Sequence, residues 1–499
     1  REAEMMDPAQ RLFIETAWAC VEDAGYRASA LAGSRTGVYA GVSTSGYAEL
    51  CQLLRSQRSA DSEMSFPFMI ANRVSYLLDW DGPSEAIDTA CSSSLVAIHR
   101  AVRSLRSGEC DLALAGGVNI IASPSVTISL SLAGMLSGDG RCKTFDDSAD
   151  GYGRGEGVAA VLLKPLSKAR SDGDHIYGLI LGSAENHGGK ATSPTAPNAL
   201  AQKDVIVAAH ADAGVDVATI GYIEAHGTGT QLGDPVELGA LAMAFTELRS
   251  KRGGMADPHP RCAIGSIKTN VAHLEAASGI AGFIKVLMMM RHRMIPGNVH
   301  LKRPNRFLEL DDSSFYLAAD THSWETRLDE RRQPIPLRAG VSSFGVGGSN
   351  AHIVLESYRQ DAAADRIAAA DACPALVVLS ARTSGQLRQQ ALQLLSALED
   401  EGQMALCDLA YTLQVGREAM DHRFGLLVET LAELREKLSR FVAGDTGIAG
   451  CFLGEVKRGR DAVSVFEADE DLRAAVAGWV AKGKYTKLLE LWTRGLTID

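Results

Sequence analysis

The chain has 499 residues, a net charge of −11 from 50 basic and 61 acidic residues, and 46% apolar residues. This length predicts at least two folded units, and the composition is that of an ordinary globular protein. No apolar run reaches the roughly 18 residues that a membrane helix needs, and no long basic run favours nucleic acid as the main ligand. The first residue is Arg1 and no signal peptide follows, so we expect a cytoplasmic piece of a longer protein.

The nine cysteines are odd in number and include no CxxC pair. This pattern predicts neither a disulfide framework nor a zinc site. We therefore expect reduced thiols in a reducing compartment and no bound metal.

Hydrophobic periodicity predicts helices and strands that alternate along the first 356 residues. The pattern gives no assignment for residues 122–140. The mixture of the two element types indicates a layered α/β architecture. The expected helices are the stretch between Asp7 and Gly25 and residues 69–78, 92–106, 199–213, 236–245 and 279–290. The expected strands are residues 36–42, 85–89, 112–118, 158–163, 177–183, 220–224, 263–266, 339–343 and 353–356.

Cys91 is the first candidate for chemistry, because it lies between the strand at 85–89 and the helix at 92–106. The free N–H groups and the positive end of the helix macrodipole favour a thiolate at such a position. The dipole is worth at most about 2 kcal/mol, enough to bring a thiol with a reference pKa near 8.5 close to neutral pH. A small buried core cysteine is the alternative, but Ser92, Ser93 and Ser94 make a poor apolar core and keep the helix start small and accessible. We predict a nucleophile that needs no dedicated base.

His226 is the second candidate, in the stretch YIEAHGTGTQLGDPVE. The strand at 220–224 delivers this histidine into a glycine-rich turn. Glycines let backbone approach a ligand closely, and the hydroxyls of Thr228 and Thr230 can hold an amide.

His273 is the third candidate, in the stretch GSIKTNVAHLEAASGIAG. A strand leads past Lys268 and Asn270 to this histidine, which opens a helix of small residues and so mirrors the Cys91 stretch. A fourth stretch, GVSSFGVGGSNAHIVLE, places Val346 in a glycine turn where backbone N–H groups can converge. His352 lies on the following strand, and we assign it a structural role.

These four stretches, in this order, resemble the ketosynthase domains of modular polyketide synthases, within the thiolase-like superfamily of condensing enzymes. The motifs are DTACSSSLVAIH, EAHGTGT, KTNVAHLEAASG and GVSSFGVGGSNAHIVLE, and the similarity covers residues 1–356. The resemblance implies a duplicated five-layer α/β/α/β/α fold, usually dimeric, in which the Cys91 and His273 stretches are related by internal pseudo-symmetry. A linker at residues 357–374 and a small α/β domain at residues 375–499 are expected to follow.

The resemblance also implies a reaction, the decarboxylative condensation of an acyl chain on Cys91 with a malonyl carrier-protein thioester. Both substrates are carried on phosphopantetheine, and the domain itself binds no cofactor. The role of Glu275 stays open. The implied site residues are Cys91 as nucleophile, the backbone N–H groups of Cys91 and Val346 as oxyanion hole, His226 and His273 as donors to the enolate, Lys268 beside His273, and Thr228, Thr230, Asn270 and Phe344 as substrate or pantetheine contacts.

Three departures from the family pattern limit this transfer. The chain starts after the family's usual first strand. Ala272 stands where a glycine often precedes the second histidine. Val346 stands where a phenylalanine often gates the cysteine, which predicts room for acyl chains that are branched near the carbonyl.

The C-terminal part resembles, more weakly, the α/β linker domain that follows ketosynthases in assembly lines without an integral acyltransferase. The matching stretches are LAYTLQVGREAM and LLELWTRGLTID. We expect a structural domain without catalysis of its own. Its expected elements are a strand at 375–380 and helices at 386–398, 431–441 and 487–492.

Three alternatives remain open at this point. A ketosynthase that only transfers acyl chains typically lacks one histidine, and here both are present. A thiolase or ketoacyl synthase that acts on coenzyme A would not need the C-terminal domain. A scaffold or docking module would not need a reactive cysteine. The expected partners are acyl carrier proteins, neighbouring synthase domains and a second copy of the chain, with a carrier-docking patch or a merely solvated face at Arg100, Arg103 and Arg106.

Overall fold

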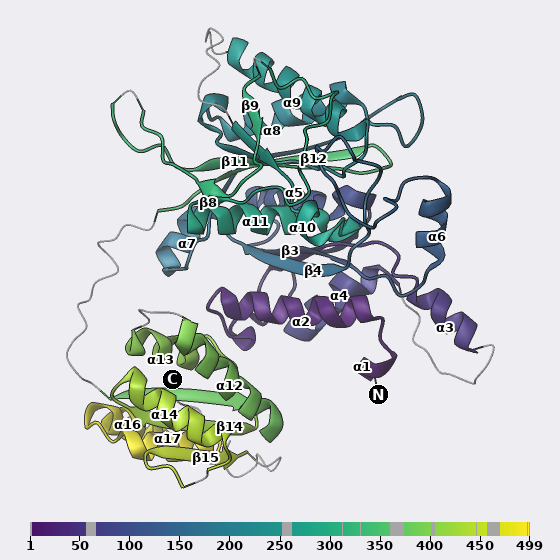
Figure 1. Cartoon of the computed structure of the whole chain (residues 1–499). Coiled ribbons are helices and arrows are strands. Elements are labelled where there is room, and N and C mark those ends of the chain that lie inside the picture. The colour runs from purple at the N-terminus through teal and green to yellow at the C-terminus, as the bar shows by residue number, and fades with distance from the viewer. Residues whose placement is uncertain are drawn as a thin grey trace. The chain divides into compact units, whose positions relative to one another are not determined.

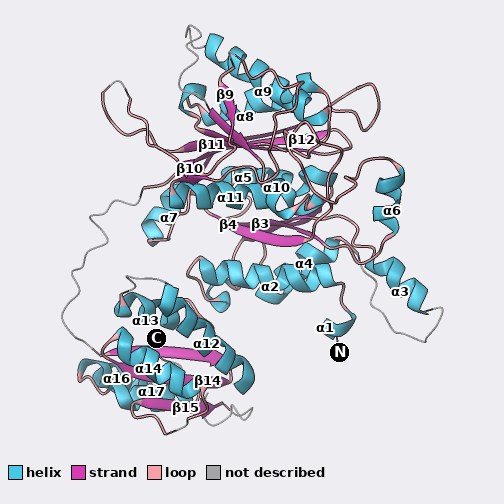
Figure 2. Cartoon of the chain, viewed as in Figure 1, coloured by secondary structure: helices cyan, strands magenta, loops and turns pink. Residues whose placement is uncertain are grey.

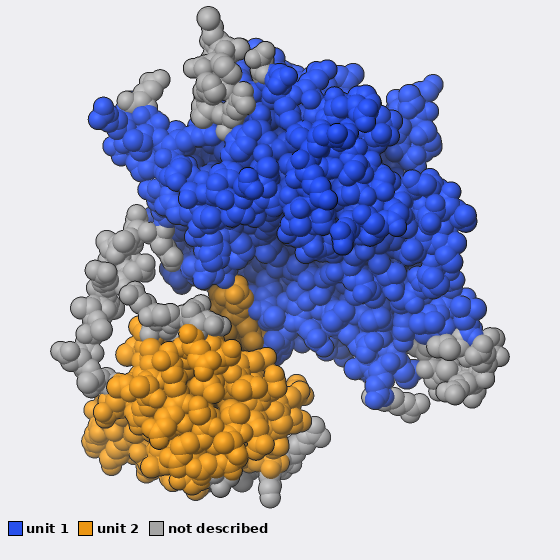
Figure 3. Space-filling model, in the orientation of Figure 1, with its two compact units in different colours: residues 1–20, 31–360 blue, residues 21–30, 361–499 orange. Residues whose placement is uncertain are grey.

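The computed structural model describes residues 2–55, 66–251, 262–311, 313–329, 331–359, 374–400, 405–445, 447–456, 470–496 and 498. The chain divides into two compact units, which Figure 3 colours separately. Unit 1 comprises residues 1–20 and 31–360, and unit 2 comprises residues 21–30 and 361–499. Residues 360–373 of the expected linker lie outside the described residues, so the domain boundaries at 356 and 375 stay predictions.

The first sheet of unit 1 has the strand order β2-β1-β3-β4. Strand β1 is parallel to both of its neighbours, and β4 is antiparallel to β3. Helix α4 contacts the sheet at β1 and β2, and α5 contacts it at β1 and β3. These elements are β1 (Thr36–Gly41), β2 (Ser84–Ile87), β3 (Leu112–Asn119), β4 (Gly157–Leu163), α4 (Phe68–Leu78) and α5 (Ser93–Ser107).

The second sheet of unit 1 has the order β5-β12-β11-β6-β7-β9. Strands β11, β6, β7 and β9 run parallel, and β12 is antiparallel to β11 and β5. Helix α11 contacts β11, and α8, which packs on α9, contacts β5 and β12. These elements are β5 (Leu179–His187), β6 (Tyr222–Glu224), β7 (Cys262–Gly265), β9 (Phe315–Leu317), β11 (Arg338–Phe344), β12 (Ser349–Glu356), α8 (Ala199–Ala213), α9 (Gly233–Ser250) and α11 (Ser278–His292).

The two sheets repeat one topology. In chain order, β1, β2, α5, β3 and β4 correspond to β6, β7, α11, β11 and β12, with the same two parallel pairs and one antiparallel pair. Helices α5 and α11 pack on each other between the sheets, so unit 1 has the predicted five layers (Figures 1 and 2). Their contact is close because Gly279 has no side chain: a Cβ there would come within 2.8 Å of the Cβ of Leu95.

The predicted elements of unit 1 are present, with shifted ends. Helix α8 has the predicted bounds, whereas β12 starts four residues before the predicted Ile353. The unassigned stretch 122–140 contains helix α6. Because this helix buries no residue, it needs no apolar stripe, and periodicity could not reveal it. The remaining elements are α1 (Glu2–Met5), α2 (Pro8–Asp23), α3 (Tyr47–Arg55), α6 (Ser125–Leu132), α7 (Leu166–Asp172), α10 (Lys268–Val271), β8 (Met294–Ile295) and β10 (His322–Ser323).

Unit 2 is a small α/β domain with the antiparallel sheet β13-β14-β15. Strand β13 and helices α12, α14 and α17 were predicted, whereas α13, β14, β15 and α16 were not. The rings of Phe424 and Phe441 stack in its core, with centroids 4.1 Å apart. The elements are β13 (Ala375–Ala381), α12 (Ser384–Asp400), α13 (Leu406–Val415), β14 (His422–Val428), α14 (Leu431–Val442), β15 (Cys451–Glu455), α16 (Glu470–Ala481) and α17 (Tyr485–Thr493).

Among the described residues, no helix combines the length and the apolar character that crossing a bilayer requires. The eight cysteines in the described ranges are all free thiols.

Candidate active site

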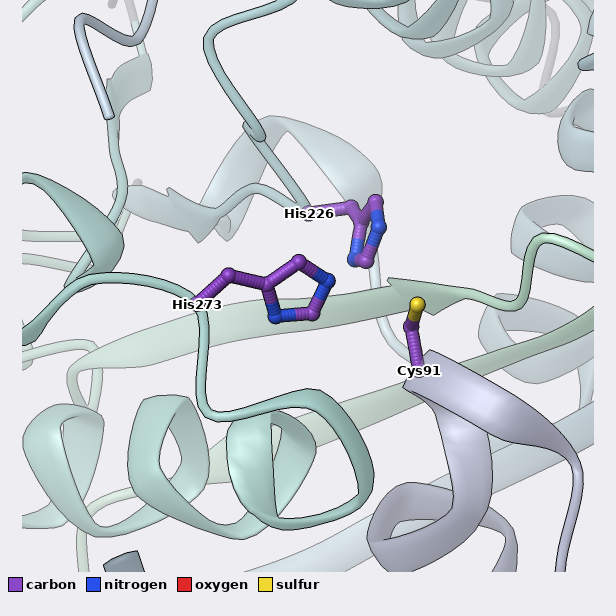
Figure 4. Close-up of side chains that lie close together, drawn as sticks. All are labelled: Cys91, His226 and His273. Atoms are coloured by element: carbon purple, nitrogen blue, oxygen red, sulfur yellow. The ribbon is translucent and has the colours of Figure 1, made fainter. Parts of the chain in front are cut away.

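Cys91, His226 and His273 meet in unit 1, although they come from three separate stretches of the chain. One side-chain atom of each lies within 4.8 Å of the others. The imidazole centroids are 5.5 Å apart and their planes make an angle of 82°. Figure 4 shows the thiol of Cys91 pointing toward both rings. The structure therefore brings the three predicted catalytic side chains together.

Cys91 occupies a short 3-10 turn, Ala90–Ser92, that joins β2 to α5. Ala90 adopts a positive φ of 58°, which turns the chain sharply before the cysteine. The Ser93 hydroxyl donates to the Ala90 carbonyl at 2.6 Å and accepts from the Thr89 N–H at 2.9 Å. We expected the serines to keep this helix start accessible, but Ser92, Ser93 and Ser94 are all fully buried. Ser92 and Ser93 satisfy backbone groups of the tight turn, whereas the Ser94 hydroxyl accepts from the Ile280 N–H on α11.

The carbonyl of Cys91 is held from the second half of unit 1. Ser343 Oγ on β11 donates to it at 2.8 Å, and Ser278 Oγ at the start of α11 donates at 3.1 Å. The cysteine turn is thereby fixed against the two elements that flank the histidines.

Burial raises the pKa of the Cys91 thiol above its ordinary value, although donation from the Val346 N–H and the charge of Lys268 act in the opposite direction. The prediction that the helix dipole brings this pKa near neutrality was therefore wrong, because desolvation outweighs the dipole. The resting group is the thiol, so a nearby base has to take its proton. The N–H groups of Val346 and Cys91 both act to lower this pKa, so both lie beside the sulfur, and their role as oxyanion hole stays a prediction.

His226 follows β6, and two carboxylates on α9 hold its turn. The Glu237 carboxylate accepts from the His226 N–H at 2.7 Å and the Gly227 N–H at 2.8 Å. The Asp234 carboxylate accepts from the Gly229 and Phe145 N–H groups. Burial raises the pKa of Asp234 to about 6 and that of Glu237 to about 7.

Sequence reasoning missed both carboxylates. Their signal was the GDPVE stretch, which places two acidic residues one helical turn apart at the start of a helix with a buried apolar face.

Lys268 lies on α10 and is 3% exposed. Burial lowers the pKa of this ammonium, and Glu224 and Glu237 act to raise it. Burial first, and then the charge of Lys268, hold the pKa values of His226 and His273 well below the usual range. Both imidazoles are therefore neutral at physiological pH, and each can donate one N–H group.

The tautomer of His273 follows from its backbone surroundings. The Glu275 N–H donates to Nδ1 of His273 at 3.0 Å, so the ring proton resides on Nε2. Nε2 is buried and has no hydrogen-bond partner among the described residues. The Tyr152 ring packs edge-on against the His273 ring, with the ring centroids 5.0 Å apart. The ring therefore presents a preoriented N–H donor that is available to a substrate.

The predicted substrate contacts lie in different environments. The hydroxyls of Thr228 and Thr230 are half-buried and 3.3 Å apart. The buried Phe344 ring lies 5.8 Å from His226, and Val346 is half-buried beside Cys91. Asn270, in contrast, is exposed and accepts a hydrogen bond from Thr269.

His352 is buried on β12, where Nδ1 shares a hydrogen bond with Ser342, and this agrees with the structural role assigned to it. The three catalytic candidates also offer donor atoms close enough together to hold a metal ion, a property that their spacing in the sequence does not reveal.

The arginines of α5 are mostly engaged within unit 1. Arg100 pairs with Glu185 at 2.6 Å, and Arg106 pairs with Asp212 at 2.7 Å. The carrier-docking patch predicted at these positions would therefore have to rest on Arg103.

The duplicated α/β fold and the Cys-His-His cluster define a thiolase-fold condensing enzyme with a cysteine nucleophile. Comparison with known families agrees. The Beta-ketoacyl synthase N-terminal domain family matches residues 1–169, the Beta-ketoacyl synthase C-terminal domain family matches residues 177–302, and the RhiE-like, KS-MAT linker domain family matches residues 378–445.

Two curated relatives show the setting in which such chains occur. Polyketide synthase PksN of Bacillus subtilis is 46% identical over 504 residues, which cover 100% of this chain and 9% of that protein. Erythronolide synthase EryA2 of Saccharopolyspora erythraea is 40% identical, and the match covers 89% of this chain and 12% of that protein. The chain thus spans about a tenth of these relatives.

Solved structures match over nearly the whole chain. The ketosynthase from module 6 of the bacillaene synthase of Bacillus subtilis 168 is 39% identical with a TM-score of 0.89, and covers 100% of this chain and 82% of that one. The ketosynthase from module 1 of the Bacillus amyloliquefaciens FZB42 bacillaene synthase is 38% identical with a TM-score of 0.84. The match covers 99% of this chain and 83% of that one. The chain belongs to the ketosynthase family, the β-ketoacyl synthases of polyketide synthases, and carries the family's C-terminal linker domain.

Proposed function

We propose that this ketosynthase extends polyketide chains by decarboxylative Claisen condensation, with Cys91, His226, His273 and Lys268 as its catalytic groups. The observation that supports this most strongly is the meeting of one thiol and two neutral imidazoles within 4.8 Å. A chain that only transferred acyl groups would need the thiol but not two donors aimed at one point. Extension is therefore favoured over transfer alone.

In the first half-reaction, an acyl chain moves from the phosphopantetheine of a carrier protein to Cys91. Because the thiol is protonated at rest and His273 has no free acceptor nitrogen, the His226 imidazole takes the proton as sulfur attacks the thioester carbonyl. The backbone N–H groups of Cys91 and Val346 stabilise the tetrahedral oxyanion. The pantetheine thiol leaves with the proton, which restores the neutral imidazole.

In the second half-reaction, a malonyl thioester loses its carboxylate as carbon dioxide, and the bonding electrons move toward the thioester oxygen. The N–H groups of His226 and His273 stabilise the enolate by donating to that oxygen. The enolate carbon attacks the Cys91 thioester, and the thiolate of Cys91 leaves. Burial, and then the charge of Lys268, keeps both imidazoles neutral, and each neutral ring donates its one N–H group.

The setting of this reaction is also part of the proposal. We assign the chain to an assembly line of the kind that lacks an integral acyltransferase, with carrier proteins and neighbouring synthase domains as partners, and we expect a homodimer. Thr228, Thr230, Asn270 and Phe344 contact the pantetheine arm or the acyl chain. The domain binds no cofactor of its own.

Intact-mass analysis of the full chain tests this function. The chain is incubated with acyl pantetheine thioesters of different chain length and branching, and then with a malonyl carrier protein. We expect an acyl adduct on Cys91, followed by loss of that adduct and a carrier-bound product that is two carbons longer. An adduct that persists with the malonyl carrier protein but moves unchanged to a carrier protein with a free pantetheine thiol would establish the transfer function instead.

A further inference from the structure

The backbone around His273 is strained on both sides of the catalytic ring. Ala272 has φ 62° and ψ −172°, a region that is essentially restricted to glycine. Glu275 has φ 45°, in the left-handed region. Two L-residues within four positions thus adopt conformations that an unconstrained chain avoids. Such a turn, residues 272–275, persists only where its surroundings hold it in place.

One strand-like segment holds this turn through its backbone. The His273 N–H donates to the Gly153 carbonyl at 2.8 Å, and the Gly155 N–H donates to the His273 carbonyl at 2.9 Å. These bonds form a short parallel bridge between Arg154 and His273. A Cβ at Gly155 would come within 2.7 Å of the Val271 carbonyl oxygen, so the segment packs tightly against the turn.

The side chain of Arg154 holds the same turn a second time. Nε donates to one carboxylate oxygen of Glu275 at 2.5 Å, and Nη2 donates to the other at 2.8 Å. Both side chains are largely buried, with exposed fractions of 6% and 14%. Nη1 donates to the Thr127 hydroxyl on α6 at 2.6 Å. The planar guanidinium therefore fixes both the position and the orientation of the Glu275 carboxylate. It also links this carboxylate to helix α6, which lies outside the site.

Glu275 in turn fixes the catalytic ring. Its backbone N–H sets the tautomer of His273, and its carbonyl accepts from Ser278 Oγ at 2.8 Å. The same Ser278 hydroxyl lies 3.1 Å from the Cys91 carbonyl. The position of Glu275 thus sets both the proton on His273 and the spacing between the two catalytic turns.

We propose that Arg154 is a positioning residue for His273. Its two-pronged ion pair with Glu275 keeps turn 272–275 in its strained conformation, and the bond to Thr127 extends this hold to α6. The proposal rests on the proposed function, because it assigns His273 to the condensation step. Without the clamp, Ala272 relaxes toward an ordinary backbone conformation, and the N–H of His273 turns away from the enolate.

The test uses the full chain and measures the two half-reactions separately. Arg154→Lys keeps the positive charge but loses the fork geometry. We expect condensation to slow by about 10-fold or more, as for a misplaced catalytic group, while acylation of Cys91 stays within about 2-fold of wild type. Ala272→Gly in the Arg154→Lys background should recover a substantial part of condensation, because glycine adopts the turn conformation without strain.

The controls separate positioning from general stability. Ala272→Gly alone should leave condensation near the wild-type rate. Thr127→Val, which preserves the Arg154 pair with Glu275, should slow condensation about 2- to 5-fold without affecting acylation. Equal losses in both half-reactions, or no recovery in the double variant, would overturn the proposal. A wild-type chain that acylates but does not condense would instead refute the proposed function.

Discussion

The two halves of unit 1 place their catalytic residues in the same way. Cys91 follows β2 and precedes α5, and His273 follows β7 and precedes α11. Each is preceded by an alanine with positive φ, 58° at Ala90 and 62° at Ala272. The repeat therefore places one sharp turn before α5 and one before α11, and each turn carries a catalytic residue of the same cluster.

The two halves differ in the contacts that hold this turn in its conformation. On the cysteine side, the hydroxyl of Ser93 bonds to backbone groups three and four positions away, and two hydroxyls of the other half, those of Ser278 and Ser343, hold the Cys91 carbonyl. On the histidine side, the fastening comes from Arg154, which lies more than a hundred residues earlier in the chain. Neutral hydroxyl groups, one of them from its own motif, thus hold the turn of Cys91, whereas a buried ion pair with a distant arginine holds the turn of His273.

The largest expected effect comes from removing the nucleophile. Cys91→Ala should abolish acylation, because no other group in the cluster forms the thioester. Mass analysis after incubation with an acyl pantetheine thioester checks this. Cys110→Ala, at a buried thiol that bonds to Ser104 away from the cluster, is the matched control and should leave the adduct intact. A persistent adduct in Cys91→Ala would place the nucleophile elsewhere.

Val346 belongs to the second half of unit 1 and lies beside the Cys91 sulfur of the first half. Its substitution tests whether both halves contact the acyl group. Val346→Phe adds an aromatic ring beside Cys91. We expect the ratio of acylation rates for branched and linear thioesters to fall by about 10- to 200-fold, the range of pocket discrimination. The turn that carries Val346 is tied down, since His187 contacts the Gly347 carbonyl at 3.0 Å. An unchanged ratio would show that Val346 does not contact the acyl chain.

Glu237 offers a test on the histidine side alone. Glu237→Gln removes an acceptor from the buried N–H of His226 or Gly227, which costs about 2 kcal/mol and corresponds to roughly 30-fold in condensation rate. Acylation should change much less. Glu247→Gln, at a partly exposed carboxylate near the far end of the same helix, is the control. Equal effects of the two variants would show that the carboxylate does not position His226.

The smallest effect concerns buried histidines outside the site. His99 on α5 bonds to Ser183, whereas neither ring nitrogen of His210 on α8 has a partner among the described residues. Burial lowers the pKa of His210 to about 4. Below pH 6.5 the unfolded chain therefore binds a proton that the folded chain does not, and stability falls as the pH drops from about 6.5 to about 4.

His210→Phe should remove this part of the acid sensitivity. Relative to wild type, the variant should gain about 2 kcal/mol in unfolding free energy between pH 7.5 and pH 5. Urea unfolding at both pH values measures the difference. A gain of the same size at both pH values would assign the effect to packing rather than to titration.

Much of this architecture follows from the sequence. Local strand, turn and helix signals predicted a layered α/β architecture and three candidate side chains, and the family resemblance of the four motifs supplied the five-layer fold and the expectation that these side chains meet. Arg154 and Glu237 were not predicted, because their roles depend on contacts that only the assembled fold creates. The thiol pKa of Cys91 was predicted in the wrong direction, because helix polarity can be inferred from sequence whereas burial depth cannot.

The division of labour between the halves is tested most directly by following His273→Ala with intact-mass analysis. The variant is given an acyl pantetheine thioester and then a malonyl carrier protein. We predict a Cys91 adduct that forms within about 3-fold of the wild-type rate and then persists, with no extended product. An extended product formed at near the wild-type rate, or acylation lost together with condensation, would contradict the assignment of His273 to the enolate step.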